Sequence, residues 1–212
     1  MNNAFVLLLA STFSVGLVHT LLGPDHYLPF VALSRSRNWS LTKTVGITTV
    51  CGLGHILSAA ALGLLAALFG NFLGRLEAVE SIRGYLAAWF LILFGAGYAV
   101  WGLAAGNRHR PSERDERREF SAWILFLIFV FGPCEPLIPL MMYPAVRDSA
   151  ARVLAVVLIF GTATLAAMLF VVIASVLGMK RLLRHRRLDR WSHPVAGGII
   201  CCCGLAMVFL GL

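Results

Sequence analysis

Six long apolar stretches divide this chain, and they constrain its fold more than any other feature. They cover about residues 4–33, 45–70, 84–105, 121–145, 153–179 and 194–212, and the first runs from 4–22 into 23–33. About 20 apolar residues cross a bilayer as a helix. With 59% hydrophobic and 13% charged residues, the chain has no room for a soluble catalytic domain. We therefore expect an all-α integral membrane protein with six transmembrane helices, and not an enzyme.

The positive charges predict how these helices are oriented. Lys and Arg residues concentrate in loops one, three and five, whereas loop two sets Arg75 and Arg83 against Glu77 and Glu80. Cytoplasmic loops carry the excess of positive charge. We therefore expect the odd-numbered loops in the cytoplasm and both termini outside, in a plasma membrane such as the bacterial inner membrane. This placement explains the net charge of +8 without a nucleic-acid partner.

Two Gly-Pro motifs indicate an internal repeat. GPDHYLPF at 23–30 aligns with GPCEPLIPL at 132–140, and Gly54-His55 in the second stretch aligns with Gly161-Thr162 in the fifth. Each half contains three spans, an odd number, so the second half must be inverted. We expect residues 1–106 and 121–212 to form two inverted three-helix repeats, joined by a charged cytoplasmic linker at 107–120. Such repeats place a substrate site near the midplane, where they meet.

The prolines predict that helices one and four are broken at these motifs. Proline lacks an amide hydrogen and disfavours helix in the residue before it. Unwound backbone at membrane depth is tolerated where it lines a cavity or is packed in protein. Asp25 and Glu135 follow the two Gly-Pro pairs, and they are the acids that we expect inside the spans. Two neighbouring buried carboxylates repel each other unless a cation lies between them.

Buried histidines supply the other candidate ligands. Imidazole suits nickel, cobalt, copper and zinc, and three histidines fall within the apolar stretches. The candidate metal-binding set is His19, Asp25, His26, His55, Cys134 and Glu135. A buried cysteine is commonly a small apolar filler, which leaves the role of Cys134 open. Thr162 and Thr164 either line the pathway or bond back to helix carbonyls.

These motifs resemble those of the nickel/cobalt permease and efflux families, which share a core with UreH-like transmembrane domains and the lysine-exporter superfamily. The resemblance rests on H-x₅-D-H at 19–26, Gly-His at 54–55 and Gly-Thr at 161–162. It implies that Asp25, His26 and His55 are metal ligands. GPCEPLIPL is also similar, more weakly, to the proline-bracketed cysteine motif of thiol-disulfide relays such as DsbD-type cytochrome-c biogenesis proteins. Those relays carry one such cysteine in each half.

We therefore expect a secondary transporter for a divalent transition-metal ion, nickel or cobalt favoured, working by alternating access through the midplane site. One alternative is a membrane thiol-disulfide relay through Cys134, although a lone cysteine lacks the partner needed to carry two electrons. Another is an exporter of a sulfur-containing anion bound at half-helix N-termini. The expected partners are the metal substrate and the lipid bilayer. The coupling ion, the direction of transport and a homo-oligomeric state are left open.

Overall fold

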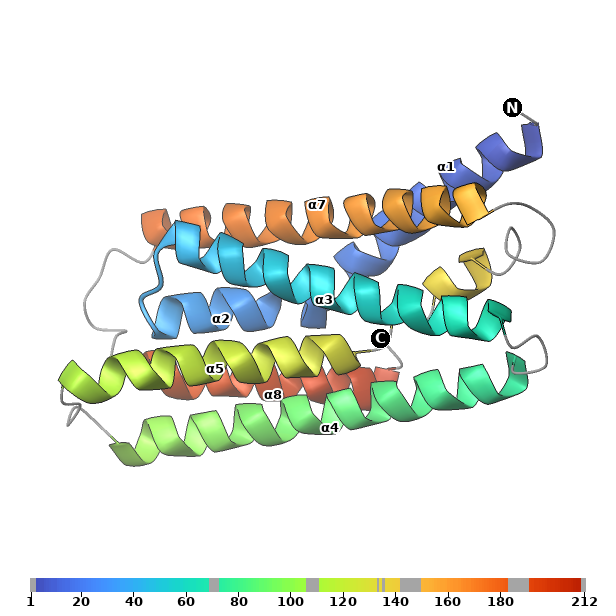
Figure 1. The fold of residues 1–212 in the computed structure, drawn as a ribbon. Coiled ribbons are helices and arrows are strands. Elements are labelled where there is room, and N and C mark those ends of the chain that lie inside the picture. The colour runs from blue at the N-terminus through green and yellow to red at the C-terminus, as the bar shows by residue number, and fades with distance from the viewer. Residues whose placement is uncertain are drawn as a thin grey trace.

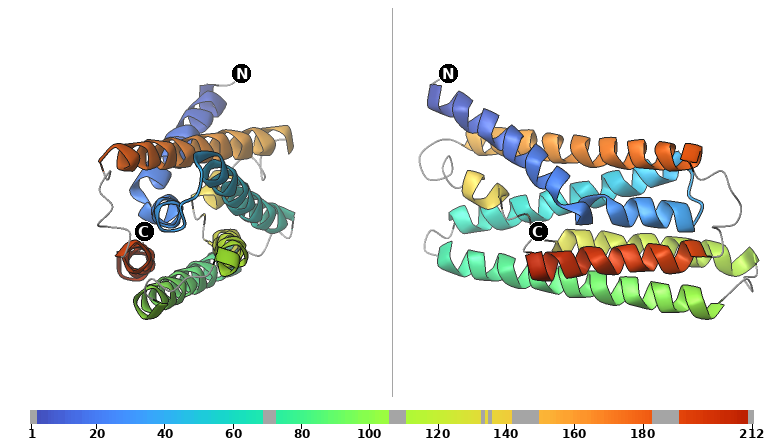
Figure 2. Two further views of the ribbon diagram at one scale, coloured as in Figure 1. Left: turned by 90° about the vertical axis from the view of Figure 1, so that its left-hand side faces the viewer. Right: turned by 180° about the vertical axis from the view of Figure 1, so that it is seen from behind.

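The computed structural model describes residues 3–68, 73–105, 111–132, 134, 136–141, 150–182 and 191–210 of the 212-residue chain, and within these ranges it contains helices and no strands. The helices form an elongated bundle (Figure 1, Figure 2). They are α1 (Asn3–Leu22), the 3-10 helix η1 (Pro24–His26), α2 (Leu28–Ser36), α3 (Leu41–Leu68), α4 (Leu73–Ala105), α5 (Pro111–Phe131), α7 (Ala150–Leu182) and α8 (Ser192–Leu210). Residues 137–141 form a further short helix.

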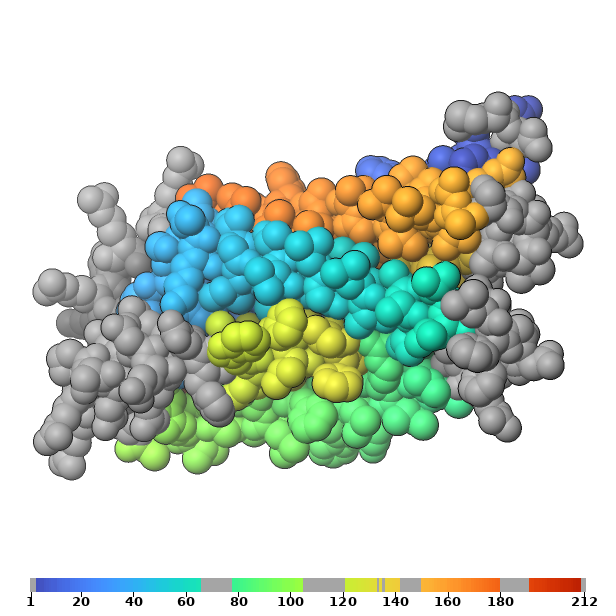
Figure 3. Space-filling model, viewed as in Figure 1, coloured from blue at the N-terminus to red at the C-terminus, as the bar shows by residue number. Residues whose placement is uncertain are grey.

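Five of these helices are long and apolar enough to cross a membrane, over Asn3–Leu22, Leu41–Leu65, Ala78–Ala104, Ala150–Met179 and Ser192–Leu210. Large apolar side chains point outward from them, such as Leu7, Phe170 and Phe209, which are 67%, 72% and 79% exposed. Figure 3 shows one such outer face, built from α7, α3, α5 and α4. Apolar surface on this scale suits lipid rather than water, so the expectation of an all-α integral membrane protein is confirmed.

The first span is broken at Gly-Pro, as the prolines predict. α1 ends at Leu22, and Gly23 is extended with φ −85° and ψ 94° before Pro24 begins η1. The Gly23 amide donates to the His19 carbonyl at 2.9 Å, and the His26 amide donates to the Gly23 carbonyl at 3.1 Å. α2 then starts with a proline in its first turn, where the missing amide hydrogen costs no helical bond. Asp25 and His26 thus lie on one tight turn between two helices.

The fourth span is also broken, and its intact apolar part is shorter than predicted. Within α5 the apolar part is Ser121–Phe131, which is too short to cross a bilayer alone. The chain is not helical at Gly132 and Cys134, and it becomes helical again over 137–141. Pro133 and Glu135 lie outside the described residues. α5 begins at Pro111, so residues 111–120 of the expected linker 107–120 are helical.

Helices from the two halves of the chain pack mainly against each other. α4 runs along α8, α1 packs against α7, and α3 packs against both α5 and α7. Glycines let α4 and α8 approach closely, since a Cβ on Gly95 would lie 2.3 Å from the Cys201 backbone nitrogen. A Cβ on Gly197 would lie 2.4 Å from the Ala99 backbone nitrogen. Only glycine fits where two helix backbones come this near.

The helix ends beside the basic loops lie at one end of the bundle. α2, α4 and α7 all end there, whereas α3 ends and α1 begins at the opposite end (Figure 1). An arrangement of this kind is what the charge pattern requires, because all basic loops must face one side of the membrane. Which side that is stays a prediction.

Candidate functional site

Three histidines from three segments meet at the break in the first span. His19 lies near the end of α1, His26 on η1 and His55 on α3. The ring centroids of His19 and His26 are 4.9 Å apart, and those of His26 and His55 are 5.4 Å apart. His26 and His55 are 4% and 3% exposed. Together with Asp25, these residues are called the histidine cluster below.

Hydrogen bonds set the orientation of two of these rings. His26 Nδ1 lies 3.3 Å from the Gly23 carbonyl oxygen and 3.3 Å from Asp25 Oδ2. His55 Nδ1 lies 3.1 Å from the Phe129 carbonyl oxygen. A carbonyl oxygen only accepts, so Nδ1 carries the proton in both rings. In the neutral imidazole this leaves a lone pair on Nε2.

Polar atoms of the histidine cluster lack partners. Nε2 of His19, His26 and His55 and Oδ1 of Asp25 are buried without a hydrogen-bond partner among the residues that the structure describes. Buried polar groups are normally paired, and each exception calls for an explanation. Metal-binding histidines typically donate their other ring nitrogen to a carboxylate or a backbone carbonyl. His26 and His55 both have that arrangement.

The glycine of each Gly-Pro motif packs against one of the oriented rings. A Cβ on Gly23 would lie 2.6 Å from His26 Nδ1. A Cβ on Gly132 would lie 3.4 Å from His55 Nδ1 and 3.2 Å from the Phe129 carbonyl oxygen. At both breaks the glycine backbone therefore lies so close to a histidine ring that a side chain on the glycine would have little or no room.

A small cavity of about 20 Å³ adjoins the cluster. This is room for about one water molecule or a bare ion. The lining comes from η1, α3, α4, the broken end of α5 and α8, and consists of Asp25, His26, His55, Ala87, Leu91, Ile128, Phe129, Gly132 and Met207. The cavity thus lies where the two halves of the chain meet.

None of the other predicted site residues that the structure describes lines this cavity. Cys134 is fully buried in an apolar cluster with Ala59, Leu137, Met141, Val156 and Phe160, and Glu135 lies outside the described residues. Thr162 is exposed, and its hydroxyl donates to the Leu158 carbonyl at 2.8 Å, which is the bond back to a helix carbonyl that the sequence leaves open as an alternative. Thr164 is fully buried, and its hydroxyl has no partner in the described ranges. Within those ranges, no three His, Cys, Asp or Glu side chains are arranged to hold a metal ion.

A buried ion pair on α4 is not evident from the sequence, where Glu80 and Arg83 are assigned to loop two. Both lie inside the span that begins at Ala78. Their side chains are 4% and 12% exposed and form an ion pair at i, i+3 spacing. The expectation that Asp25 and Glu135 are the acids within the spans is therefore wrong, because Glu80 is another. Opposite charges at i, i+3 beside an apolar stretch are the signal that could have identified it.

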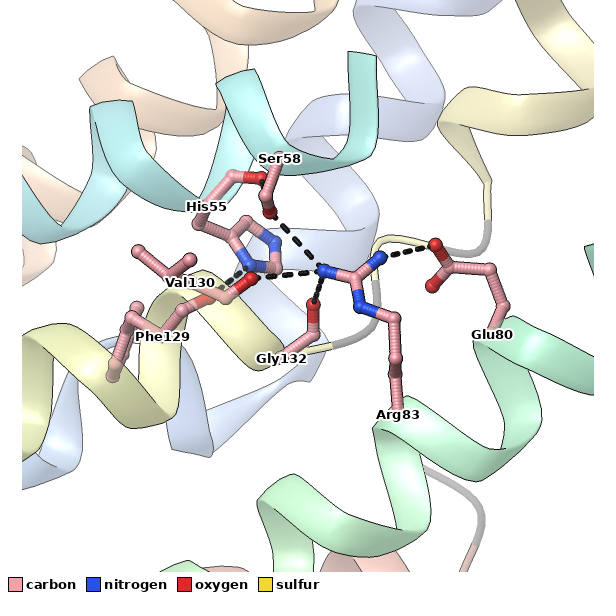
Figure 4. A network of polar contacts seen from close by, with 7 residues as sticks. All are labelled: His55, Ser58, Glu80, Arg83, Phe129, Val130 and Gly132. Atoms are coloured by element: carbon pink, nitrogen blue, oxygen red, sulfur yellow. Dashed lines mark hydrogen bonds and ion pairs between the residues drawn. The ribbon is translucent and has the colours of Figure 1, made fainter. Parts of the chain in front are cut away.

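Arg83 connects this ion pair to the broken end of α5 (Figure 4). Its Nη2 donates to the Val130 carbonyl at 2.8 Å and to the Gly132 carbonyl at 3.4 Å. The same nitrogen lies 3.2 Å from the hydroxyl of Ser58 on α3. Carbonyls at a helix end lack intrahelical donors, and the guanidinium supplies donors here.

A second polar network lies further along α4. The Tyr98 hydroxyl bonds to Ser36 Oγ at 3.0 Å and to His193 Nδ1 at 2.8 Å. The Arg37 guanidinium stacks over the rings of Tyr98 and Trp101, at 4.9 Å and 5.2 Å from their centroids. On α4, the cavity-lining Ala87 and Leu91 fall between Arg83 and Tyr98. The cavity is therefore bracketed along the bundle by two arginine networks.

These features define a class: a helical membrane protein whose first and fourth spans are broken around a central polar site. A family model described as "Cytochrome C biogenesis protein transmembrane region" matches residues 27–206, and the chain belongs to this family. No curated protein and no solved structure matches it. The family match supports the weaker resemblance, to the membrane domains of thiol-disulfide relays, and does not support the nickel/cobalt permease resemblance. The matched region includes His55 and Cys134 but leaves out His19, Asp25 and His26.

Proposed function

We propose that the chain moves a divalent transition-metal ion across the membrane through the histidine cluster. The observation that carries this proposal is the pair His26 and His55. Each ring donates from Nδ1 to an oxygen and leaves a buried Nε2 without a partner among the described residues. An unsatisfied buried polar group is costly, and an imidazole nitrogen oriented in this way suits a first-row transition metal.

Asp25 supports the same reading through its charge. One carboxylate oxygen holds His26, and the other is buried and has no partner in the part of the chain that the structure describes, so it is available to an ion. A carboxylate at membrane depth needs a compensating partner. Because no three ligands are arranged as a closed site in the described part of the chain, loading the ion requires at least one of these side chains to turn toward it. Weak binding suits a transporter, since the ion must also leave.

The packing of the helices supports two inverted halves. The first helix of each half packs against the second helix of the other half. α1 of the first half packs against α7 of the second, and α5 of the second half packs against α3 of the first. The third helices, α4 and α8, pack against each other, and each third helix also contacts the broken first helix of the other half. This pattern is unchanged when the halves are exchanged, as a pseudo-two-fold axis requires. Rocking of one half against the other would expose the cavity to alternate sides.

Family membership favours a second candidate, a thiol-disulfide relay through Cys134. This residue lies at the break of the fourth span, where the resemblance implies a relay cysteine. Two observations weigh against the relay. The matching position in the first half is Asp25, and Cys134 is fully buried among apolar side chains, whereas reactive thiolates occupy partly exposed, electropositive places. The other buried cysteines, Cys51 and Cys203, belong to a different hydrophobic cluster, so neither packs in the cluster around Cys134 as a second thiol.

Uptake into proteoliposomes tests the two candidates together. The full chain is reconstituted around a metal-sensitive dye, and Co²⁺, Ni²⁺, Zn²⁺ and Mn²⁺ are offered in turn. We expect uptake of at least one ion, and a reduction of about tenfold or more in His26→Gln and His55→Gln. His193→Gln is the matched control, because this histidine bonds to Tyr98 and does not line the cavity.

The outcome separates metal transport from the relay. Metal transport predicts that Cys134→Ser keeps most of the uptake, because this side chain packs among apolar residues. The relay predicts no metal uptake by the wild type, together with a mixed disulfide that can be trapped on Cys134 and is lost in Cys134→Ser. Wild-type uptake in both histidine variants, or no uptake of any ion by the wild type, would refute our proposal.

A further inference from the structure

We propose that Arg83 is a positioning residue for the site. Glu80 holds Arg83 in place, and Arg83 closes the broken end of α5 beside the cavity. This closure fixes the Phe129 carbonyl, which orients the His55 ring. The part that concerns metal binding rests on the proposed function. The closure of α5 does not, and it can be tested separately.

The first step concerns the open end of α5. Its last carbonyls have no donors within the helix. The Phe129 carbonyl accepts from His55 Nδ1 at 3.1 Å and from the Gly132 amide at 3.1 Å. The next carbonyl, that of Val130, accepts from Arg83 at 2.8 Å. Two consecutive carbonyls are thus held by two side chains from other helices, and the position of one affects the other.

The second step is the connection through α3. Ser58 Oγ accepts from Arg83 Nη2 at 3.2 Å and donates to the carbonyl oxygen of His55 at 2.8 Å. Arg83 therefore acts on His55 by two routes. Through α5 it holds the carbonyl next to the one that accepts the His55 hydrogen bond, and through Ser58 it reaches the backbone carbonyl of His55 itself. Loss of the guanidinium would loosen both sides of the contact that sets the ring orientation.

The third step is the electrostatic environment. A helix C-terminus carries a partial negative charge, which a nearby cation stabilises. Glu80, one turn earlier on α4, forms an ion pair with Arg83 and holds it in place. Ala87, one turn later, lines the cavity, as does Gly132, whose carbonyl Arg83 binds. The arginine thus lies beside the cavity without lining it.

The test compares Arg83→Gln and Arg83→Lys with Arg37→Gln. Arg37 is the matched control: it also joins several helices, by stacking on Tyr98 and Trp101 and donating to Ser121, but it does so on the other side of the cavity. The first measurement is the rate at which N-ethylmaleimide labels Cys134 in the purified full chain, followed by mass spectrometry. Cys134 is fully buried and lies two residues beyond Gly132, whose carbonyl Arg83 binds.

We expect Arg83→Gln to label about tenfold faster than the wild type or more, because charge-assisted hydrogen bonds that close the end of α5 are lost. Arg37→Gln should label at the wild-type rate, and Arg83→Lys should fall between, since an ammonium keeps the charge without the planar fork. Equal labelling in Arg83→Gln and Arg37→Gln would overturn the inference. If Arg83→Gln does not fold, the neutral pair Glu80→Gln with Arg83→Gln takes its place, because it leaves no uncompensated buried charge.

The second measurement is Co²⁺ affinity, by titration of the same proteins. Loss of an outer partner of a metal-binding histidine typically weakens binding about 10–100-fold, and we expect this in Arg83→Gln but not in Arg37→Gln. Unchanged affinity in Arg83→Gln would overturn the positioning role. If the wild type binds no metal ion, the proposed function fails, and the labelling rates still decide whether Arg83 closes the end of α5.

Discussion

Replacing Gly23 with alanine tests the geometry of the first break most directly. The added Cβ would lie 2.6 Å from His26 Nδ1, 2.9 Å from Asp25 Oδ1 and 3.0 Å from His26 Cε1. The backbone itself gives no cause for strain, since φ −85° is open to any residue. The whole effect must come from these contacts. The rings of His19 and His55, whose centroids lie 4.9 Å and 5.4 Å from that of His26, limit how far the His26 ring can shift.

The expected cost follows from these contacts. Overpacking a buried site costs about 1–3 kcal/mol, and breaking the charged contact between His26 and Asp25 adds about 1.5–3 kcal/mol. Removing a glycine from the unfolded chain returns about 0.4–1 kcal/mol. At about 2–4 °C per kcal/mol for a chain of this size, Gly23→Ala should melt several degrees lower than the wild type.

The assay is thermal stability in detergent, read from the monodisperse peak on size exclusion. Gly97→Ala is the control, because nothing lies within 4 Å of the Cβ that it adds on α4. Alanine is also the better helix former, so this variant should melt at the wild-type temperature or above. A Gly23→Ala protein as stable as Gly97→Ala would show that His26 and Asp25 do not lie against this glycine, and the orientation argued for His26 would fall with it.

Two further variants test the packing around the site. Gly95→Ala should not give a folded protein, because its Cβ would lie 2.3 Å from the Cys201 backbone nitrogen and neither helix backbone can yield; a wild-type elution profile would contradict the close α4–α8 contact. Tyr98→Phe removes the hydroxyl bonds to Ser36 and His193, so we expect a loss of about 1–3 kcal/mol in the free energy of unfolding, measured as a lower melting temperature. Its Co²⁺ affinity should match that of the wild type, and a weakened affinity would show that this network reaches the cavity.

The helices were largely predictable from sequence because a bilayer leaves the backbone few choices. Each span must satisfy its own hydrogen bonds, so apolar length alone locates α1, α3, α7 and α8 to within a few residues. α4 and α5 are exceptions, since α4 begins at Leu73 rather than near residue 84 and α5 begins at Pro111 rather than near residue 121. Glu80 and Arg83 each lower the mean hydropathy of the segment, whereas in the folded chain they form an ion pair. Whether two charges neutralise each other depends on packing that a sliding window does not see.

The site was predictable only in part, for a similar reason. The prolines indicated both breaks, and the residue types indicated the histidine cluster. The groups that orient it come from distant parts of the chain: His55 bonds to Phe129, 74 residues away, and Arg83 bonds to Val130, 47 residues away. Residue spacing gives no access to such contacts. Cys134 shows that matching sequence positions need not have matching surroundings. It aligns with Asp25 in the sequence repeat, but it packs in an apolar cluster and does not line the cavity.

The family match and the histidine cluster therefore concern different parts of one scaffold. The match begins at Tyr27, directly after His26, and extends through the break that carries Cys134. What this chain shares with its family lies within residues 27–206, and a shared core does not determine chemistry. A relay that carries two electrons within one chain needs a second thiol that can pair with Cys134. This chain has a carboxylate and an imidazole at the first break. Among the described residues that line the cavity there is no cysteine. Groups of this kind can bind cations and cannot exchange disulfides, so we expect substitutions at the first break, outside the matched region, to separate the two candidate functions.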